Sequence, residues 1–168
     1  TYCASANVVL HTGAKAVMVD VSKDDFNIAI DNIEAAITPK TKVIMPVDIS
    51  GFPCDYNEIL NLAHKHKKIF TPKNEKQSKL GRILIASDAA HSFGALYCGK
   101  RSGSLADVTC FSFHAVKNLT TAEGGAVCFN LTDSFDHDEI YKDYVTITLH
   151  GQSKDALAKS KKGAWKYD

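Results

Sequence analysis

The sequence lacks any long hydrophobic run and any excess of charge of one sign. No apolar stretch approaches the ~20 residues that span a bilayer, and we expect no signal peptide at the start of the chain. The 20 basic and 19 acidic residues leave a net charge of +1, which gives no indication of a nucleic-acid partner. We therefore expect partners that are neither nucleic acid nor membrane.

The sequence also lacks a paired cysteine motif. Its five cysteines are odd in number, scattered and without a C-x-x-C pair: Cys3, Cys54, Cys98, Cys110 and Cys128. Several lie within apolar runs, which is typical of buried thiols in a reduced protein rather than of a disulfide scaffold. This spacing predicts a cytoplasmic protein and argues against a zinc site or any other metal site.

The chain is long enough for one domain with a substantial core. It has 168 residues, of which 45% are hydrophobic and 23% charged, as in ordinary globular proteins. No internal repeat is present. The sequence begins at Thr1 rather than at a methionine and ends after "GAWKYD". We expect it to be a fragment of a longer protein.

Apolar runs and helical periodicity alternate along the chain. Two segments have helical spacing, 31–37 and 56–67, and the second places Ile59, Leu62 and Ala63 on one face. Five apolar runs predict strands: 15–20, 42–49, 82–90, 106–114 and 125–130. The strands are continuously apolar, which predicts a mostly parallel sheet covered by helices on both faces, a three-layer α/β/α fold.

The segment 70–82, "FTPKNEKQSKLGR", interrupts this alternation because it is polar and rich in lysine. It is longer than a connection between a helix and a strand usually needs. We predict an exposed surface loop. A basic insertion that binds a partner is the alternative, which is less favoured because a charge run is usually solvated surface.

Polar residues follow two of the predicted strands. Asp88 and His91 follow the run 82–90, and Ser112, His114 and Lys117 end the run 106–114 or follow it. In open α/β sheets, ligands bind at the carboxyl ends of the strands. We therefore expect these groups to converge on one edge of the sheet, with the "EGG" at 123–125 letting the chain turn back sharply.

A lysine and an aspartate in this position suggest a particular cofactor. Apolar surroundings lower the pKa of a lysine, and the neutral amine is a nucleophile towards a carbonyl. A nearby carboxylate keeps a pyridine nitrogen protonated, and the two groups together are what an enzyme dependent on pyridoxal phosphate uses. The pair is therefore compatible with pyridoxal 5'-phosphate as the cofactor.

Four stretches of the chain carry a family resemblance: "TYCASANVVLHTGAKAVMVDV" (1–21), "AIDNIEAAITPKTKVIMPVDISGFPCD" (29–55), "SDAAHSFGA" (87–95) and "GSLADVTCFSFHAVKNLTTAEGGAV" (103–127). The chain resembles the large, cofactor-binding domain of the DegT/DnrJ/EryC1/StrS family, sugar aminotransferases of fold type I that use pyridoxal phosphate. The resemblance covers nearly the whole chain. Its string FSFH-x-x-KN-x-T-x-x-EGG is long and specific.

The resemblance implies a role for each of five residues. Lys117 would form the Schiff base with the cofactor and move the proton between substrate and cofactor. Asp88 would pair with the pyridine nitrogen, and His91 would lie near the phenolic oxygen or the ring. Ser112 would bind the phosphate. Tyr2, expected at the start of a strand, would stack on the ring.

The resemblance also implies a reaction and its partners. An amino group would pass from an amino acid, expected to be glutamate, to a nucleotide-linked keto-sugar used for cell-surface polysaccharides or secondary metabolites. The enzyme would be a homodimer. Family members have a phosphate-binding loop before the position of Thr1 and a small domain after that of Asp168. We therefore expect 1–168 to be part of the large domain, with little or no activity alone.

Other interpretations stay open. The same fold supports a lyase, a desulfurase or a sugar dehydratase, although the resemblance predicts a histidine in place of Lys117 in the dehydratases. A regulatory member without turnover is a further alternative. Taken singly, Lys117 would be interpreted as a surface lysine and Asp88 as a turn or helix-capping residue. Ser112 would be interpreted as a residue that faces away from the site, and His114 as a residue that packs beside it.

Several short motifs are rejected. "GALYCGKR" (94–101) resembles a P-loop but has Arg101 where Ser or Thr is required. His64 and His66 are two residues apart on a predicted helix and so point in different directions, which argues against metal binding by the pair. Two "NLT" sequons, at 118–120 and 130–132, are interpreted as chance matches.

Overall fold

A computed structural model describes residues 2–149 and 151 of the chain. It divides into two compact units, Thr1–Leu131 and Thr132–Asp168. In the second unit, helix α5 (His137–Thr148) begins after Asp136, whose carboxylate accepts hydrogen bonds from the backbone N–H groups of Asp138 and Glu139. All the other helices and strands of the described residues belong to the first unit.

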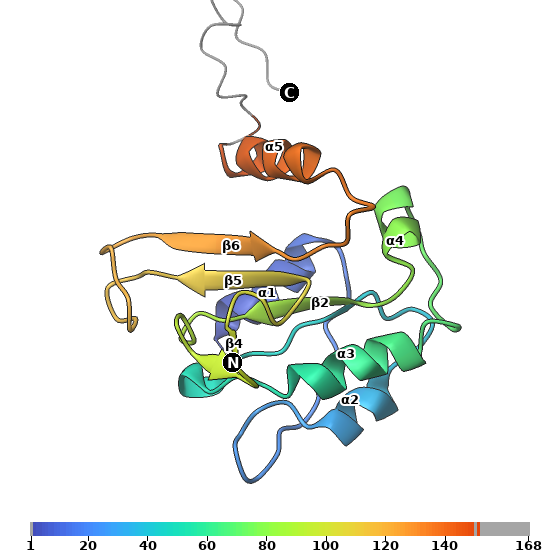
Figure 1. The fold of residues 1–168 in the computed structure, drawn as a ribbon. Coiled ribbons are helices and arrows are strands. Elements are labelled where there is room, and N and C mark those ends of the chain that lie inside the picture. Colours follow the sequence, from blue (N-terminus) through green and yellow to red (C-terminus); the bar gives the residue numbers. More distant parts are fainter. Residues whose placement is uncertain (1, 150, 152–168) are drawn as a thin grey trace, which may run out of the picture. The chain divides into compact units, whose positions relative to one another are not determined.

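The first unit is built on a four-stranded sheet with the order β1-β2-β5-β6 (Figure 1). Its strands are β1 (Val43–Ile44), β2 (Leu84–Asp88), β5 (Val108–Ser112) and β6 (Gly125–Phe129). The first two pairings are parallel, and β5 pairs with β6 antiparallel. In the central pairing, Asp88 lies opposite Cys110. The predicted α/β class with a mostly parallel sheet is confirmed.

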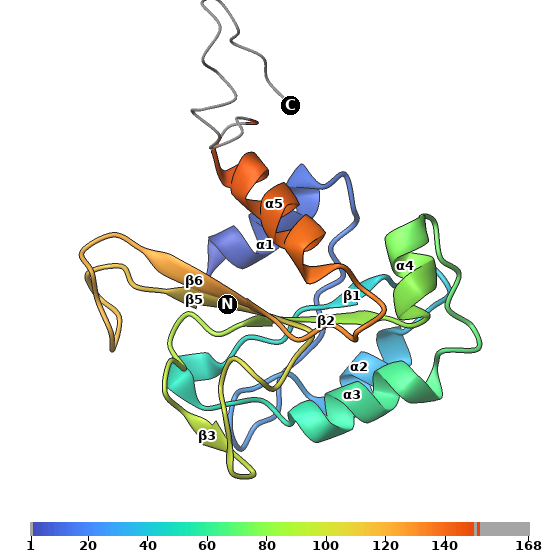
Figure 2. The same ribbon diagram turned by 45° about the horizontal axis from the view of Figure 1, so that its top comes forward.

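Helices lie on both sides of this sheet. The helices are α1 (Cys3–His11), α2 (Ile30–Ala36) and α3 (Tyr56–Lys65). Figure 2 shows α2 and α3 together on one side and α1 on the other. The arrangement has the predicted three-layer order.

Helix α3 forms where the sequence predicts it. Asp55 caps its first turn, because its side chain accepts a hydrogen bond from the backbone N–H of Glu58 at 3.1 Å. The side chains of Ile59, Leu62 and Ala63 are buried, as their spacing predicts, in a core that also includes the β2 strand. This packing fixes α3 on the sheet.

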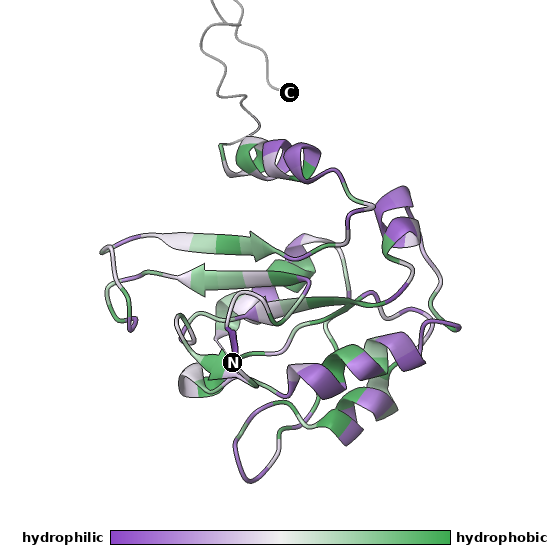
Figure 3. Ribbon diagram, in the orientation of Figure 1, coloured by the Kyte–Doolittle hydropathy of each residue, from purple (hydrophilic) through white to green (hydrophobic). Residues whose placement is uncertain are grey.

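Figure 3 shows the strands of the sheet mostly in the hydrophobic colour and helix α4 (Glu75–Leu80) mostly in the hydrophilic colour. None of the helices among the described residues combines the length and the apolarity needed to cross a membrane. The predicted P-loop look-alike is instead a hairpin, formed by β3 (Leu96–Tyr97) and β4 (Lys100–Arg101).

Helix α4 corrects the prediction of a loop over 70–82. The Asn74 side chain accepts a hydrogen bond from the backbone N–H of Gln77 at 2.8 Å, and Gly81 ends the helix with φ at 67°. These are the usual start and stop signals of a helix. The segment is largely exposed, as predicted, but its polar residues face solvent from a helix of 6 residues.

The predicted strand over 15–20 is wrong. The structure has no strand there, and nearby only an isolated bridge joins Val21 to Ile28. Val17 and Met18 are 64% and 71% exposed, so the run is apolar without lying inside the sheet. No neighbouring strand supplies hydrogen-bond partners to it in the described part of the chain.

The predicted strand over 42–49 is shortened to β1. Pro46 interrupts it because proline has no backbone N–H to donate to a ladder. The chain nevertheless continues beside β2, since the Pro46 carbonyl accepts from the backbone N–H of Asp88 at 2.9 Å and Val47 forms a bridge with Asp88. The run 46–48 therefore reaches the end of β2.

An ion pair fixes the opposite end of β2. Both terminal nitrogens of Arg82 donate to the Asp107 carboxylate at 2.7 Å, and the backbone N–H of Ile85 donates to the same carboxylate at 2.8 Å. The Arg82 and Asp107 side chains are 12% and 6% exposed. This pair joins the start of β2 to the turn before β5.

Candidate active site

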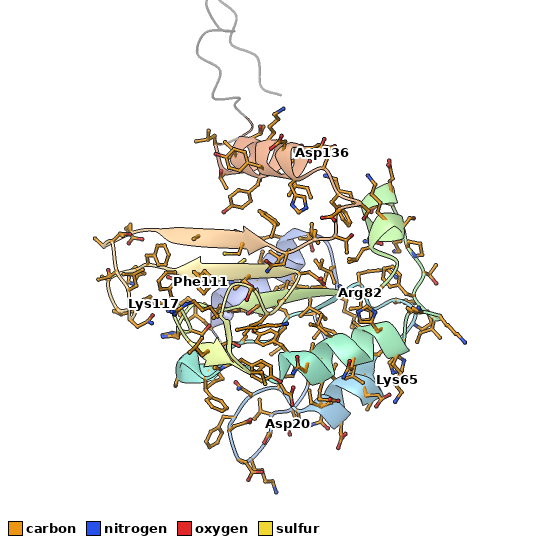
Figure 4. The ribbon with its side chains drawn as sticks, viewed as in Figure 1. Asp20, Lys65, Arg82, Phe111, Lys117 and Asp136 are labelled. Atoms are coloured by element: carbon orange, nitrogen blue, oxygen red, sulfur yellow. The ribbon has the colours of Figure 1, made fainter. Side chains whose placement is uncertain are left out.

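Two parallel strands end side by side and carry the candidate residues. Asp88 is the last residue of β2 and Ser112 the last of β5. Lys117 follows on the connection 113–124 between β5 and β6. Figure 4 shows Lys117 at the end of the sheet to which β5 points, and Arg82 at the opposite end. These candidate residues therefore lie at the carboxyl edge of the sheet, where the sequence predicts them.

The structure brings Lys117 and His91 into contact. The Lys117 Nζ atom lies 2.9 Å from His91 Nε2, so the amine and the imidazole share a hydrogen bond. The Lys117 side chain is half-buried, and its backbone N–H donates to the carbonyl of His114 at 2.9 Å. The imidazole of His114 points elsewhere, 3.6 Å from the Glu123 carboxylate.

A second contact joins the turn after β2 to the connection after β5. The Asn118 side-chain amide donates to the carbonyl of Phe93 at 2.9 Å. The ring of Phe93 meets those of Phe111 and Phe113 edge to face, at centroid distances of 5.2 and 5.4 Å. The two segments that carry His91 and Lys117 are therefore fixed to each other.

The "EGG" motif works differently from the prediction. The left-handed position of the turn is taken by Ala122, with φ at 66°. A Cβ on Gly124 would come within 2.3 Å of the Thr121 hydroxyl, and one on Gly125 within 2.7 Å of the Phe111 carbonyl. The glycines are thus required by the close approach of neighbouring atoms rather than by the turn itself.

Asp88 is held by two hydrogen bonds. Its Oδ2 atom accepts from the Ser5 hydroxyl at 2.5 Å, and its Oδ1 atom accepts from the backbone N–H of Ala90 at 3.2 Å. Asp88 therefore caps a turn rather than a helix. Sequence reasoning missed Ser5, which belongs to α1 and is separated from Asp88 by 83 positions, so no local pattern signals the contact.

Ser112 lies on the same face of the sheet as Asp88. Asp88 pairs with Cys110, and side chains alternate along a strand, so the residue two positions further shares that face. The Ser112 hydroxyl accepts from the backbone N–H of His114 at 3.4 Å. Cys110 is a neighbour that the prediction omitted; burial, and then the Asp88 carboxylate, raise the pKa of its thiol.

Tyr2 is placed less directly. It precedes helix α1 as the N-cap, so the expected strand start is wrong, because the Tyr2 carbonyl accepts the backbone N–H of Ser5 and begins a helix. Its side chain is 76% exposed. Within residues 2–149, no hydrogen bond or ring contact joins this side chain to the other four candidates.

The groups present fit pyridoxal phosphate. Four side chains supply an amine, a carboxylate, an imidazole and a hydroxyl, in that order Lys117, Asp88, His91 and Ser112. These complement an aldehyde, a pyridine nitrogen, a phenolic oxygen and a phosphate. The amine already has a defined neighbour and lies at the same edge as the carboxylate.

Solved structures of known proteins resemble the fold of this chain. Sugar aminotransferase Spr1654 of Streptococcus pneumoniae matches the whole chain in its PMP form at 49% identity and a TM-score of 0.90, and 42% of that chain is covered. Its PLP form matches with a TM-score of 0.88. These likenesses confirm the predicted fold type I arrangement.

Two relatives come from a comparison of sequences. The spore coat polysaccharide biosynthesis protein SpsC of Bacillus subtilis is 35% identical over 100% of this chain, and GDP-perosamine synthase of Caulobacter vibrioides is 43% identical over 79% of it. The chain spans 38% of the first relative and 32% of the second. The family model described as the DegT/DnrJ/EryC1/StrS aminotransferase family matches residues 1–165. The chain belongs to the DegT/DnrJ/EryC1/StrS aminotransferase family.

Proposed function

We propose that the protein containing this chain is an aminotransferase that uses pyridoxal phosphate to move an amino group from an amino acid to a nucleotide-linked keto-sugar. The observation that carries the proposal is the Lys117 amine, 2.9 Å from His91 at the edge where Asp88 ends its strand. An amine, an imidazole and a carboxylate at the carboxyl ends of parallel strands are the groups that this chemistry requires.

Each side chain has a task in this proposal. Pyridoxal phosphate, when bound, supplies an electron sink for the substrate carbon that carries the amino group. The Lys117 amine would hold the cofactor at its aldehyde carbon and, once the substrate amine has replaced it there, would take and return the proton at that substrate carbon. The Asp88 carboxylate keeps the pyridine nitrogen protonated, and the Ser5 hydroxyl at 2.5 Å fixes the orientation of that carboxylate.

The remaining candidates bind and orient. The Ser112 hydroxyl would donate to the phosphate, His91, which contacts Lys117, would lie near the phenolic oxygen or the ring, and the Tyr2 ring would stack on the cofactor. Because the Tyr2 side chain is exposed and close in sequence to Ser5, a bound ring would give it a partner. The two half-reactions use one site in turn, so amino donor and sugar acceptor bind alternately.

The names of two relatives support the proposed substrate class. GDP-perosamine synthase supports a nucleotide-linked sugar as acceptor, and SpsC supports use of the product in a polysaccharide. We propose glutamate as the amino donor and a homodimer as the working form. All five cysteines of the chain are free, which supports a reducing compartment such as the cytoplasm.

The first test is the absorbance spectrum of the purified full-length protein with added pyridoxal phosphate, before and after reduction with borohydride, followed by peptide mapping. We expect a stable reduced adduct on Lys117. The Lys117→Ala variant should give no adduct. The Lys100→Ala variant, which removes an exposed lysine from β4, should give as much adduct as the unchanged protein.

The outcomes separate the alternatives. If the full-length protein gives no adduct, the aminotransferase proposal is wrong and a regulatory member without turnover remains. If the adduct forms, incubation with glutamate and a set of nucleotide-linked keto-sugars should yield 2-oxoglutarate and an amino-sugar in equal amounts. Adduct formation with release of sulfide or ammonia instead would identify a desulfurase or a lyase.

A further inference from the structure

A cluster of buried polar side chains lies beneath the turn that carries His91. The buried polar cluster consists of the buried residues Asp48, Tyr56, Ser87 and Ser92, together with the half-buried Ser102. Asp48 and Ser92 are each 1% exposed, and Tyr56 is also 1% exposed. A set of buried polar groups is costly unless every member has partners, so its hydrogen bonds need an account.

Asp48 is the acceptor at the centre of the cluster. Its Oδ1 atom accepts from the Tyr56 hydroxyl at 2.7 Å and from the backbone N–H of Cys54 at 3.1 Å. Its Oδ2 atom accepts from the Ser92 hydroxyl at 2.6 Å. No ion pair to Asp48 occurs among residues 2–149, so uncharged hydrogen-bond donors rather than a cation satisfy the carboxylate.

The direction of each hydrogen bond follows from this arrangement. The Tyr56 hydroxyl donates to the carboxylate, so the Ser87 hydroxyl, 2.5 Å away, donates to Tyr56. Ser92 likewise donates to Asp48, so Ser102 donates to Ser92 at 2.9 Å. Burial, and then the Asp48 carboxylate, raise the pKa of Tyr56, so its hydroxyl keeps its proton. Two chains of donors therefore converge on Asp48.

The same residue holds both ends of the turn. The Asp48 backbone N–H donates to the Asp88 carbonyl at 3.0 Å, and its side chain accepts from Ser92. His91 lies between these two anchored positions. Gly51 packs directly against the backbone of His91, because a Cβ on Gly51 would come within 2.6 Å of the His91 carbonyl oxygen. The backbone of His91 thus has little freedom to move away from Lys117.

We propose that Asp48 is a positioning residue, which acts through Ser92 to hold His91 against the Lys117 amine. The proposal deepens the function proposed above and rests on it. It gives a buried carboxylate a task at the site although Asp48 touches neither substrate nor cofactor. A purely structural cluster would stabilise the core but leave the contact between His91 and Lys117 unaffected.

The test compares two serine variants of the full-length protein. Ser92→Ala removes the link between Asp48 and the turn. Ser102→Ala is the matched control, because it removes one hydroxyl of the same cluster and leaves that link in place. Asp48→Asn is a further variant that keeps the shape of the side chain but faces Ser92 with a donor or a weaker, uncharged acceptor.

The first measurement needs no cofactor. The NMR signal of the His91 imidazole is recorded in the cofactor-free protein with and without the change Lys117→Ala. In the unchanged protein and in Ser102→Ala, removing the lysine should shift this signal. In Ser92→Ala the shift should be lost, because His91 no longer meets the lysine. Hydrogen exchange at the Ser92 and Ala95 amides, both bonded within the turn, should speed up in Ser92→Ala alone.

The second measurement is catalytic. With the loaded enzyme, Ser92→Ala should lower kcat about tenfold or more with little change in the KM of the sugar, because a group held out of place slows the chemical step rather than binding. Ser102→Ala should stay close to the unchanged protein. Asp48→Asn should lie between the two, which keeps the test decisive if Ser92→Ala does not fold.

Two results would overturn the proposal. One is a His91 signal that still responds to Lys117→Ala in the Ser92→Ala variant. The other is a fall in kcat that, in both Ser92→Ala and Ser102→Ala, is simply proportional to the loss of melting temperature. A third result separates the two proposals. If the His91 signal stops responding to Lys117→Ala in the Ser92→Ala variant, but neither the unchanged protein nor any variant forms an adduct on Lys117, the positioning inference is supported and the proposed function fails.

Discussion

Gly51 has little room beside the turn that carries His91. Its φ is +85°, and a Cβ would come within 2.6 Å of the His91 carbonyl oxygen. Gly51→Ala should destabilise the protein by more than about 2 kcal/mol, because left-handed strain of about 1–2 kcal/mol adds to a clash between backbone atoms. Urea unfolding measures the free energy, and the His91 imidazole signal reports whether the clash displaces the turn.

Gly94 offers a control with the same backbone strain. Its φ is also +85°, but nothing lies within 4 Å of the place where its Cβ would be. Gly94→Ala should therefore cost only the strain. Equal losses of unfolding free energy in the two variants would show that the contact between Gly51 and His91 does not constrain the turn.

Some of the candidate residues could be predicted from the sequence and others could not. Asp88, His91 and Lys117 follow from the rule that ligands bind at the carboxyl ends of parallel strands, together with the family resemblance. Ser5 and Asp48 could not be found in this way, because their partners are 83 and 44 positions away in the sequence. Contacts of this kind depend on the packing of layers, which no local pattern records.

Among the secondary-structure elements, those with a packed face were the predictable ones. The runs 82–90, 106–114 and 125–130 each contain a strand, and 56–67 contains α3. The run 15–20 failed because its apolar side chains lie largely at the surface without a strand beside them. Helix α1 was not predicted, and it has no buried residue to give its sequence a helical pattern.

Helix α4 shows a signal that was present and overlooked. Asn74 is followed three positions later by Gln77, whose side chain accepts from the backbone N–H of Lys73 at 2.8 Å, and Gly81 follows the last turn. This is the pattern of a capped helix. The lysines masked it, because a charge run suggests solvated loop as readily as a solvated helix.

Arg82 joins the start of β2 to the turn before β5, and its replacement should strongly lower the free energy of unfolding. Arg82→Ala leaves the Asp107 carboxylate, whose side chain is 6% exposed, without its bidentate partner. Removing one partner of a buried pair costs about 3–5 kcal/mol. Denaturant unfolding should show this loss. The Lys117 adduct should still form under native conditions, because Arg82 lies at the opposite end of β2, and its disappearance would contradict this separation.

Glu34 joins α2 to the end of α3 in a pH-dependent way. The Glu34 carboxylate lies 2.5 Å from Lys65 Nζ and 2.9 Å from His66 Nε2. The hydrogen bond with Lys65, and then that with His66, lowers the pKa of Glu34 in the folded protein below its ordinary 4.5. A lowered folded-state pKa gives stability that is present above the unfolded value and is lost as the pH falls through the folded value.

The Glu34→Gln variant tests this dependence. It should be less stable than the unchanged protein near neutral pH, and the difference should shrink as the pH falls below about 4.5. Because Glu34 and Lys65 are partly exposed, added salt should also reduce the difference. Free energies of unfolding at a series of pH values measure it. A difference that stays constant with pH would mean that the ion pair contributes nothing.

At the scale of the whole molecule, the first unit contains the complete described sheet and site. The core cluster and all five candidate residues lie within Thr1–Leu131. We expect a polypeptide of residues 1–131 to unfold cooperatively in urea, with a midpoint close to that of residues 1–168. Circular dichroism at increasing urea measures this. A gradual change without a transition would show that residues 132–168 are needed for folding.

The alternation of side chains along β2 has a consequence for changes of chain length. Ser87 belongs to the buried polar cluster on one side of the strand. The next residue, Asp88, faces Ser5 on the other side. Inserting or deleting one residue within Leu84–Asp88 would exchange the two sides, placing a carboxylate in the core and a hydroxyl at the site. Variants of the gene that differ in length are therefore expected to carry their insertions and deletions in segments such as 70–82, with this strand kept at constant length.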